Sequence, residues 1–223
     1  ISALRPSVDA TTPESLSLHK RKVSMLIWSV KDDLDNIQQQ EQQQLFAKAL
    51  QIHALLDRNI EQLYTTQRLA AEGERQRLGD APAQQLWQEY RQELADISEA
   101  LELYAKALWA NMKNATNAQA QKAYRVLAMR IGRSHSLLSE HYAEAYAGEA
   151  DAEGAARAWQ RSALIATDLV NKEQQTENNT KRVNYYRHQS AARWNRASFY
   201  WMNTQNEEAI ARALNEAERA LTF

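Results

Sequence analysis

The chain has 223 residues, with 27 Lys and Arg against 28 Asp and Glu, a net charge of −1, five Gly, three Pro and no Cys. That length supports a buried core in one large or two small domains, and the near-neutral charge argues against a general nucleic-acid-binding protein, which is normally basic. The absence of Cys excludes disulfides, thiolate zinc sites, iron–sulfur clusters and cysteine nucleophiles.

The first thirteen residues are predicted to be a leader rather than part of a helix. Residues 1–13 are small, polar and Pro-containing and show no helical period, so we expect a flexible leader or tether there. A signal peptide or membrane anchor could have preceded Ile1. Because a chain without Cys suits a bacterial periplasm, an exported or membrane-tethered protein is favoured over a cytoplasmic one.

A long helical segment follows the leader. It is predicted to begin near Pro13, which fits the first turn of a helix. Apolar residues repeat at helical spacing over residues 16–37 and, in shifted phase, over residues 45–63. The Gln-rich run at residues 38–44 is either a solvated part of one continuous helix or a short loop between two helices.

The next helix carries the clearest pattern in the chain. Asp80 is a candidate N-cap and Pro82 fits the first turn. Spacings of three and four residues then alternate without a break, as in a coiled-coil seam, at Trp87, Tyr90, Leu94, Ile97, Leu101, Tyr104 and Leu108. Because the connection before Asp80 is short and contains Gly, residues 14–115 are predicted to form a long antiparallel helical hairpin. Such a seam suits an intramolecular partner as well as a dimer, which leaves the oligomeric state open.

The second half changes from long aliphatic side chains to small ones. Helices are predicted from residue 116 to 147, from Asp151 to about 170, after the polar break at residues 171–180, and after the turn at residues 203–206. Each helix combines alanines with a bulky aromatic residue, which is typical of stacked helical hairpins. No strand-like alternation occurs, so an all-α fold is predicted, with residues 116–223 as a second region.

Two stretches of the second half follow a small–aromatic–small–bulky order. The residues are Ala143, Tyr146, Ala155, Trp159 and Ser162 in the first stretch, and Ala197, Tyr200, Ala209 and Ala213 in the second. In this order the second half resembles tetratricopeptide repeats. The resemblance implies a superhelical body with a concave face that binds another protein or a peptide. Any tight antiparallel helical hairpin also favours small residues beside an aromatic one, so both interpretations stay open.

No pattern of catalytic or metal-ligating residues stands out. The five His residues show no HExxH or ExxH arrangement, and His135 and His141 point away from each other on a helix. A GxSxG elbow and a phosphate-binding glycine loop are both missing from the sequence. We therefore expect no catalytic residues, no metal, no cofactor and no enzymatic activity.

One helix stands above this background. Residues 181–201 contain basic and aromatic residues and no acid. Beside the apolar face of this helix lies a stripe predicted to bind an acidic or aromatic segment of a protein partner, formed by Arg182, Tyr185, Arg193, Arg196 and Tyr200. The alternative is that these arginines pair with acids of neighbouring helices, for instance Glu207, Glu208 or Glu216.

The function favoured by the sequence is a non-enzymatic helical scaffold or adaptor that binds a protein or peptide through a concave or groove surface. A helical, ligand-binding sensory ectodomain of a membrane receptor is the first alternative. A nucleic-acid-binding helical domain is the second, and the neutral net charge counts against it.

Overall fold

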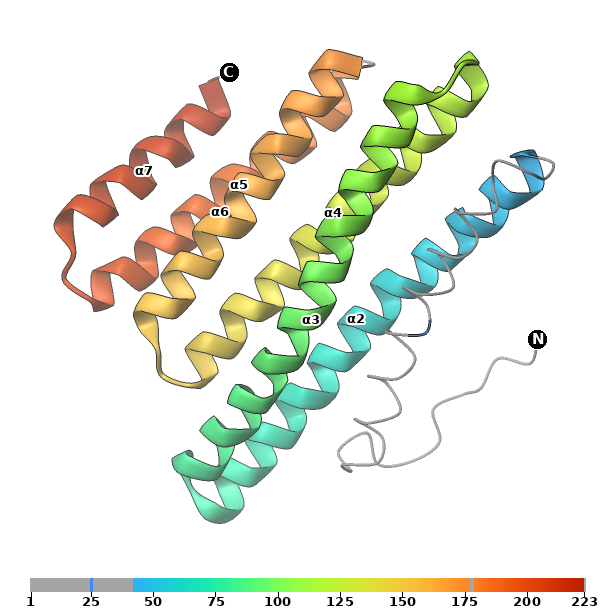
Figure 1. Cartoon of the computed structure of the whole chain (residues 1–223). Coiled ribbons are helices and arrows are strands. Elements are labelled where there is room, and N and C mark those ends of the chain that lie inside the picture. Colours follow the sequence, from blue (N-terminus) through green and yellow to red (C-terminus); the bar gives the residue numbers. More distant parts are fainter. Residues whose placement is uncertain (1–24, 26–41, 177–178, 223) are drawn as a thin grey trace. The chain divides into compact units, whose positions relative to one another are not determined.

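A computed structural model describes residues 25, 42–176 and 179–222, which are almost wholly helical (Figure 1). The helices are α2 (Gln42–Leu78), α3 (Asp80–Asn114), α4 (Ala118–Gly148), α5 (Ala152–Thr176), α6 (Thr180–Asn203) and α7 (Glu207–Thr222). None of the described residues lies in a β-strand, so the predicted all-α class is confirmed. The predicted leader, the helix start near Pro13 and most of the Gln-rich run lie outside the described residues.

The chain divides into two units inside α3, one up to Tyr90 and one from Arg91 onward. In the first unit a single residue, Gly79, links α2 to α3, and its φ of +94° lies in the left-handed region that favours glycine. Beyond this turn the two helices lie side by side. The amide of Gln67 donates a hydrogen bond to the carbonyl of Leu86 at 2.7 Å, and the rings of Tyr64 and Trp87 are 6.2 Å apart. That residues 14–115 act as one hairpin region stays a prediction.

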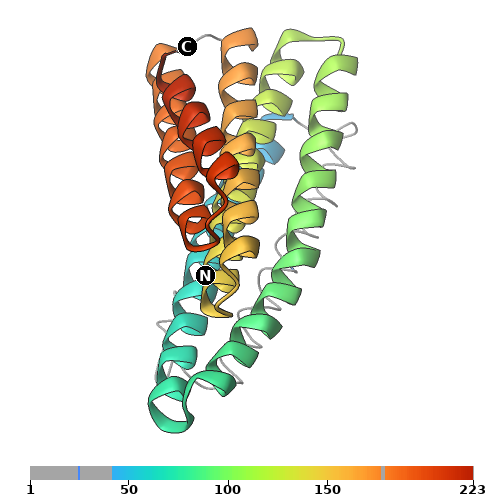
Figure 2. The same ribbon diagram turned by 90° about the vertical axis from the view of Figure 1, so that its left-hand side faces the viewer.

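In the second unit each helix packs against the next, α4 on α5, α5 on α6 and α6 on α7. Successive helices run in opposite directions (Figures 1 and 2). Polar side chains cap the first turns of α5 and α6. Asp151 accepts a hydrogen bond from the backbone N–H of Gly154 at 2.8 Å, and Asn179 accepts one from the backbone N–H of Arg182 at 3.1 Å. As predicted, Asp151 therefore opens a helix. The helix before the polar break extends to Thr176, further than the apolar pattern indicates.

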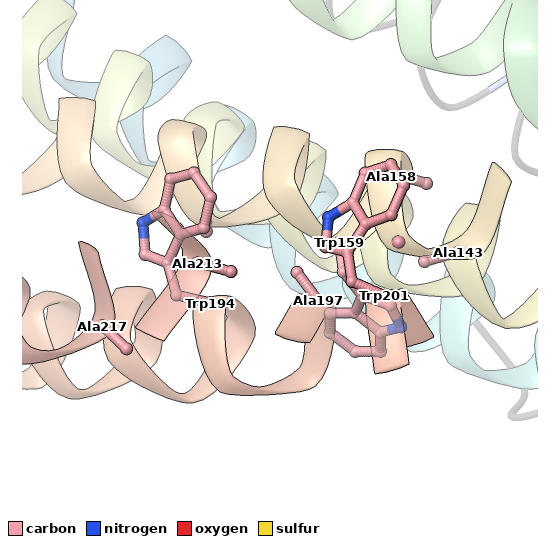
Figure 3. Packing of buried hydrophobic residues seen from close by; sticks show 10 residues of the cluster. Ala143, Ala158, Trp159, Trp194, Ala197, Trp201, Ala213 and Ala217 are labelled. Carbon is pink, nitrogen blue, oxygen red and sulfur yellow. The ribbon is translucent and has the colours of Figure 1, made fainter. Parts of the chain in front are cut away.

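The core of the second unit combines tryptophans with alanines. Trp159 of α5 and Trp194 and Trp201 of α6 are all buried and belong to one cluster (Figure 3). The alanines packed with them include Ala143, Ala158, Ala197, Ala213 and Ala217. Because a methyl group occupies little space at a helix crossing, the neighbouring helix approaches closely and the large rings fill the remaining volume. This is the small-plus-aromatic pattern that the sequence shows.

Candidate functional site

The predicted stripe on α6 faces neighbouring helices of its own unit. Arg193 is 8% exposed, and its Nε donates to Oε1 of Glu140 on α4 at 2.8 Å, while Nη2 donates to the same oxygen. The Nη2 atom of Arg196 lies 3.8 Å from Oε1 of Glu144, one turn further along α4. Burial raises the pKa of Glu144, and the charge of Arg196 opposes that shift. Two of the predicted residues are thus engaged with α4.

Arg182, at the start of the stripe, reaches α5 instead. Its Nε lies 3.1 Å from Oε1 of Glu173, whose side chain is fully buried. The same carboxylate lies 4.0 Å from Arg125 of α4, so it is bracketed by two guanidinium groups. Burial lowers the pKa of Arg125, and the charge of Glu173 works against that shift. This three-residue group connects α4, α5 and α6.

The two tyrosines of the stripe differ in their surroundings. Tyr200 is partly buried and packs on the tryptophan–alanine cluster, and burial raises the pKa of its phenol. Tyr185 is 45% exposed, and its ring lies 5.3 Å from that of Tyr186. The three arginines of the stripe pair with acids of neighbouring helices, but these are Glu140, Glu144 and Glu173 rather than the α7 acids suggested by the sequence. That the stripe binds a partner stays a prediction.

An open groove lies elsewhere in the second unit. Its walls are formed by α3 and α5, and its floor by α4. Its first compartment, of about 510 Å³, is lined by Ala95, Ser98, Glu99, Glu102, Ser139, Tyr142, Tyr146, Gly154, Arg157, Ala158 and Arg161. Its second compartment, of about 330 Å³, is lined by Glu102, Ala105, Lys106, Trp109, Ala128, Gly132, His135, Arg161, Leu164, Ile165, Asp168, Leu169 and Lys172. Glu102 and Arg161 belong to both compartments and form an ion pair of 3.0 Å across the groove.

The walls of the α3–α5 groove carry charges of both signs. Lys106 donates a hydrogen bond to Glu102 at 2.8 Å, and this bond, with the charge of Arg161, lowers the pKa of the Glu102 carboxyl. At the Trp109 end, the ammonium of Lys172 lies 4.9 Å from the centre of the indole ring. Leu164 of α5 lines the second compartment and is 57% exposed, so it adds apolar surface to the groove.

Ser98 and His135 come together in the wall and floor of this groove. The Oγ of Ser98 lies 3.0 Å from Nε2 of His135, and both side chains are buried. Burial lowers the pKa of His135 to about 4, with the charge of Arg161 acting in the same direction, so the imidazole is neutral at pH 7. A serine beside a neutral imidazole can in principle act as a nucleophile. Ser98 lies inside α3, however, where backbone N–H groups bond within the helix and supply no donors for an oxyanion.

Within the described part of the chain, no group of three or more His, Asp or Glu residues is arranged to hold a metal ion. None of the described helices combines the length and apolarity needed to cross a membrane.

The α3–α5 groove was not predicted from the sequence. Residues of its two walls, such as Glu102 and Arg161, are far apart in the chain, and helical periodicity alone does not pair them.

Comparisons with known proteins give little further guidance. No family model matches the chain, and none of the curated proteins compared with it matches. Among solved structures, a chain described as "DHF79 filament" is similar at 15% sequence identity, with a TM-score of 0.44, over 90% of this chain and 85% of that one. A likeness of this size carries no argument about function.

Proposed function

We propose that the chain is a non-enzymatic helical scaffold that binds an amphipathic helical segment of a protein partner in the α3–α5 groove. The observation that carries this proposal is the groove itself, which joins an exposed leucine, aromatic ends and charged walls above a floor of small residues. Ala128, Gly132 and Ser139 supply that floor.

The length of the groove suits a short helix. Along α3 it extends from Ala95 to Trp109, which at the rise of an α-helix is about 21 Å. A partner helix of about four turns covers that distance. Its apolar face would lie against Leu164, which leaves a large part of its side chain in water.

The charges favour a particular polarity in the partner. The α3 wall carries Glu99 and Glu102, and the α5 wall carries Arg157 and Arg161. Arg157 pairs with Glu153 one turn earlier on α5, and Arg161 pairs with Glu102 across the groove, so a helix that lies along the groove must displace the second pair. The four side chains are 39–70% exposed. Exposed pairs contribute only about 0–1 kcal/mol, so a partner can replace them at little cost. We expect a helix with basic residues on the side facing α3 and acidic residues on the side facing α5.

The tetratricopeptide-like pattern supports the same kind of function. Its first stretch, residues 139–162, covers parts of α4 and α5, which form the floor and one wall of the groove. The family's grooves hold peptide segments of other proteins. The likeness therefore agrees with a peptide-binding role for this surface.

The test uses a display library of amphipathic helical peptides selected against the full chain. Ala95→Trp fills the first compartment from an exposed position, and Ala107→Trp, on the same helix but outside the groove lining, is the matched control. Selected peptides should bind the A95W variant at least tenfold more weakly than the wild type, and the A107W variant within about twofold. Bound peptide should slow hydrogen exchange in α3 and α5. Peptides that bind A95W as tightly as the wild type would contradict the proposal.

A further inference from the structure

A second pocket lies between α5, α6 and α7, away from the α3–α5 groove. It has a volume of about 410 Å³. Its polar lining comes from Thr167, Asn171 and Gln174 of α5, Arg187 and Ser190 of α6, and Glu216 and Arg219 of α7. Beside it, Trp194 of α6 packs with Ala213 and Ala217 of α7, which holds these two helices together (Figure 3).

Arg187 is the unusual residue of this pocket. The other arginines of α6 that the structure describes, Arg182, Arg193 and Arg196, each form an ion pair with a glutamate of α4 or α5. Arg187 is partly buried, and its Nε is fully buried, yet within residues 42–176 and 179–222 that atom has no hydrogen-bond partner. The Arg187 side chain also lines the pocket, and because a guanidinium is always charged near neutral pH, a guanidinium with an unsatisfied donor favours an acceptor that enters beside it.

The remaining polar groups of the pocket include both donors and acceptors. Asn171 and Gln174, one turn apart on α5, can both present amide N–H groups. The hydroxyls of Thr167 and Ser190 are 2.8 Å apart, and each also lies within hydrogen-bond distance of the carbonyl of Ala163. These two hydroxyls are therefore already engaged inside the protein and form the polar floor.

The charge of the lining selects the class of ligand. Arg187 and Arg219 contribute two positive charges and Glu216 one negative charge, and Glu216 lies 3.6 Å from Arg219. The net charge of the lining is thus +1 (two minus one), which a singly charged anion balances and a doubly charged phosphate exceeds. A planar carboxylate also matches the guanidinium fork, which can donate two parallel hydrogen bonds to it. Val170 and Ala220 supply an apolar side for methylene groups.

We propose that this pocket binds a carboxylate group carried on a short aliphatic chain, with Arg187 as its principal hydrogen-bond donor. The carboxylate belongs either to a free organic acid or to a glutamate side chain of a peptide, since both present the same group on methylenes. This site is separate from the proposed α3–α5 groove, and its occupation does not depend on that function.

The test follows the Nε–H signal of Arg187 by ¹H–¹⁵N NMR on the full chain. Butyrate and a blocked tripeptide with a central glutamate are titrated separately at constant ionic strength, with butyramide and chloride as uncharged and inorganic controls. A saturable shift with butyrate identifies a free-acid site, and a shift with the tripeptide alone identifies a peptide-carboxylate site. Either result supports the proposal, provided that butyramide and chloride leave the signal in place.

Three variants test the role of Arg187 and the position of the site. Binding to the variants is measured from the backbone amide signals of the pocket lining, because Arg187→Gln removes the Arg187 side-chain signal. Arg187→Gln should weaken binding at least tenfold, whereas Arg212→Gln, at an exposed position on α7 outside the lining, should change it less than twofold. Asn171→Leu, which narrows the pocket from an exposed position on α5, should also weaken binding and guards against a folding defect specific to the Arg187 variant. The proposal is overturned if neither carboxylate moves the Arg187 signal, or if the R187Q variant binds as tightly as the wild type.

Discussion

Removing the guanidinium of Arg193 should destabilise the protein much more than removing that of Arg196. Arg193 is held by Glu140 with its side chain only 9% exposed, and Glu140 itself is 28% exposed. Arg196 is 53% exposed, and its distance to Glu144 is 3.8 Å. The two positions are one turn apart on α6 and face the same helix, so they form a matched pair that differs mainly in burial.

The magnitude follows from that difference in burial. Breaking a fully buried ion pair from one side costs about 3–5 kcal/mol, because the remaining charge is left uncompensated, while an exposed pair contributes about 0–1 kcal/mol. Glu140 retains some contact with water, so Arg193→Met should lower the free energy of unfolding by about 2–3 kcal/mol. Arg196→Met should lower it by less than about 1 kcal/mol. The first change corresponds to a fall in Tm of about 6–12 °C for a unit of this size.

Urea unfolding at pH 7, followed by far-UV circular dichroism, measures both variants. A double-mutant cycle of Arg193→Met with Glu140→Gln should give a coupling energy of about 1–3 kcal/mol, because each single change leaves the other group without its partner. If Arg193→Met costs no more than Arg196→Met, Arg193 is not fixed between α6 and α4. That result would favour the predicted partner-binding role of the stripe, because its arginines would be available to another molecule.

Acid should destabilise the fold. Burial lowers the pKa of both His135 and His141 to about 4. Between pH 6.5 and 4 the unfolded chain therefore binds protons that the folded chain does not. In urea unfolding, the free energy of unfolding at pH 5 should be lower than at pH 7 by about 2 kcal/mol for each histidine. Gly154→Ala should lower stability by about 1–3 kcal/mol, because a Cβ there would lie 2.4 Å from the ring of Tyr146. Gly73→Ala, an exposed helical position with nothing within 4 Å of the added Cβ, should raise stability in the same assay by about 0.5–1 kcal/mol.

The helices and their caps could be predicted because their causes are local. Asp151 opens α5 through its own side chain, which accepts the N–H of Gly154 three residues later. The end of α5 was less well predicted, because residues 171–176 are polar and were interpreted as a break. Lys, Glu and Gln are nevertheless good helix formers, and the helix continues on propensity to Thr176 after its apolar face has ended.

The environment of the predicted stripe depends on tertiary neighbours. Helical spacing predicts that Arg182, Arg193 and Arg196 form a stripe beside the buried face of α6, whereas Arg193 is itself buried. Helical spacing does not say whether that stripe meets water or another helix. In the folded unit these arginines lie beside three glutamates of α4 and α5, namely Glu140, Glu144 and Glu173. Because these glutamates belong to other helices, spacing within α6 does not predict the pairs.

Whether an arginine of α6 has an acidic partner therefore indicates its role better than the number of basic residues around it. In the sequence, Arg187 is one basic residue among several and lies outside the predicted stripe. In the fold, Arg193 gains a carboxylate through two N–H groups, whereas the buried Nε of Arg187 gains none among the described residues. A guanidinium already satisfied by its own chain has little to gain from a ligand, because binding must first replace that bond. Carboxylate recognition on α6 is consequently expected at Arg187 rather than at Arg193, and the contrast between R187Q and the Arg193 variants measures this directly: the first should affect ligand binding, and the second should affect stability.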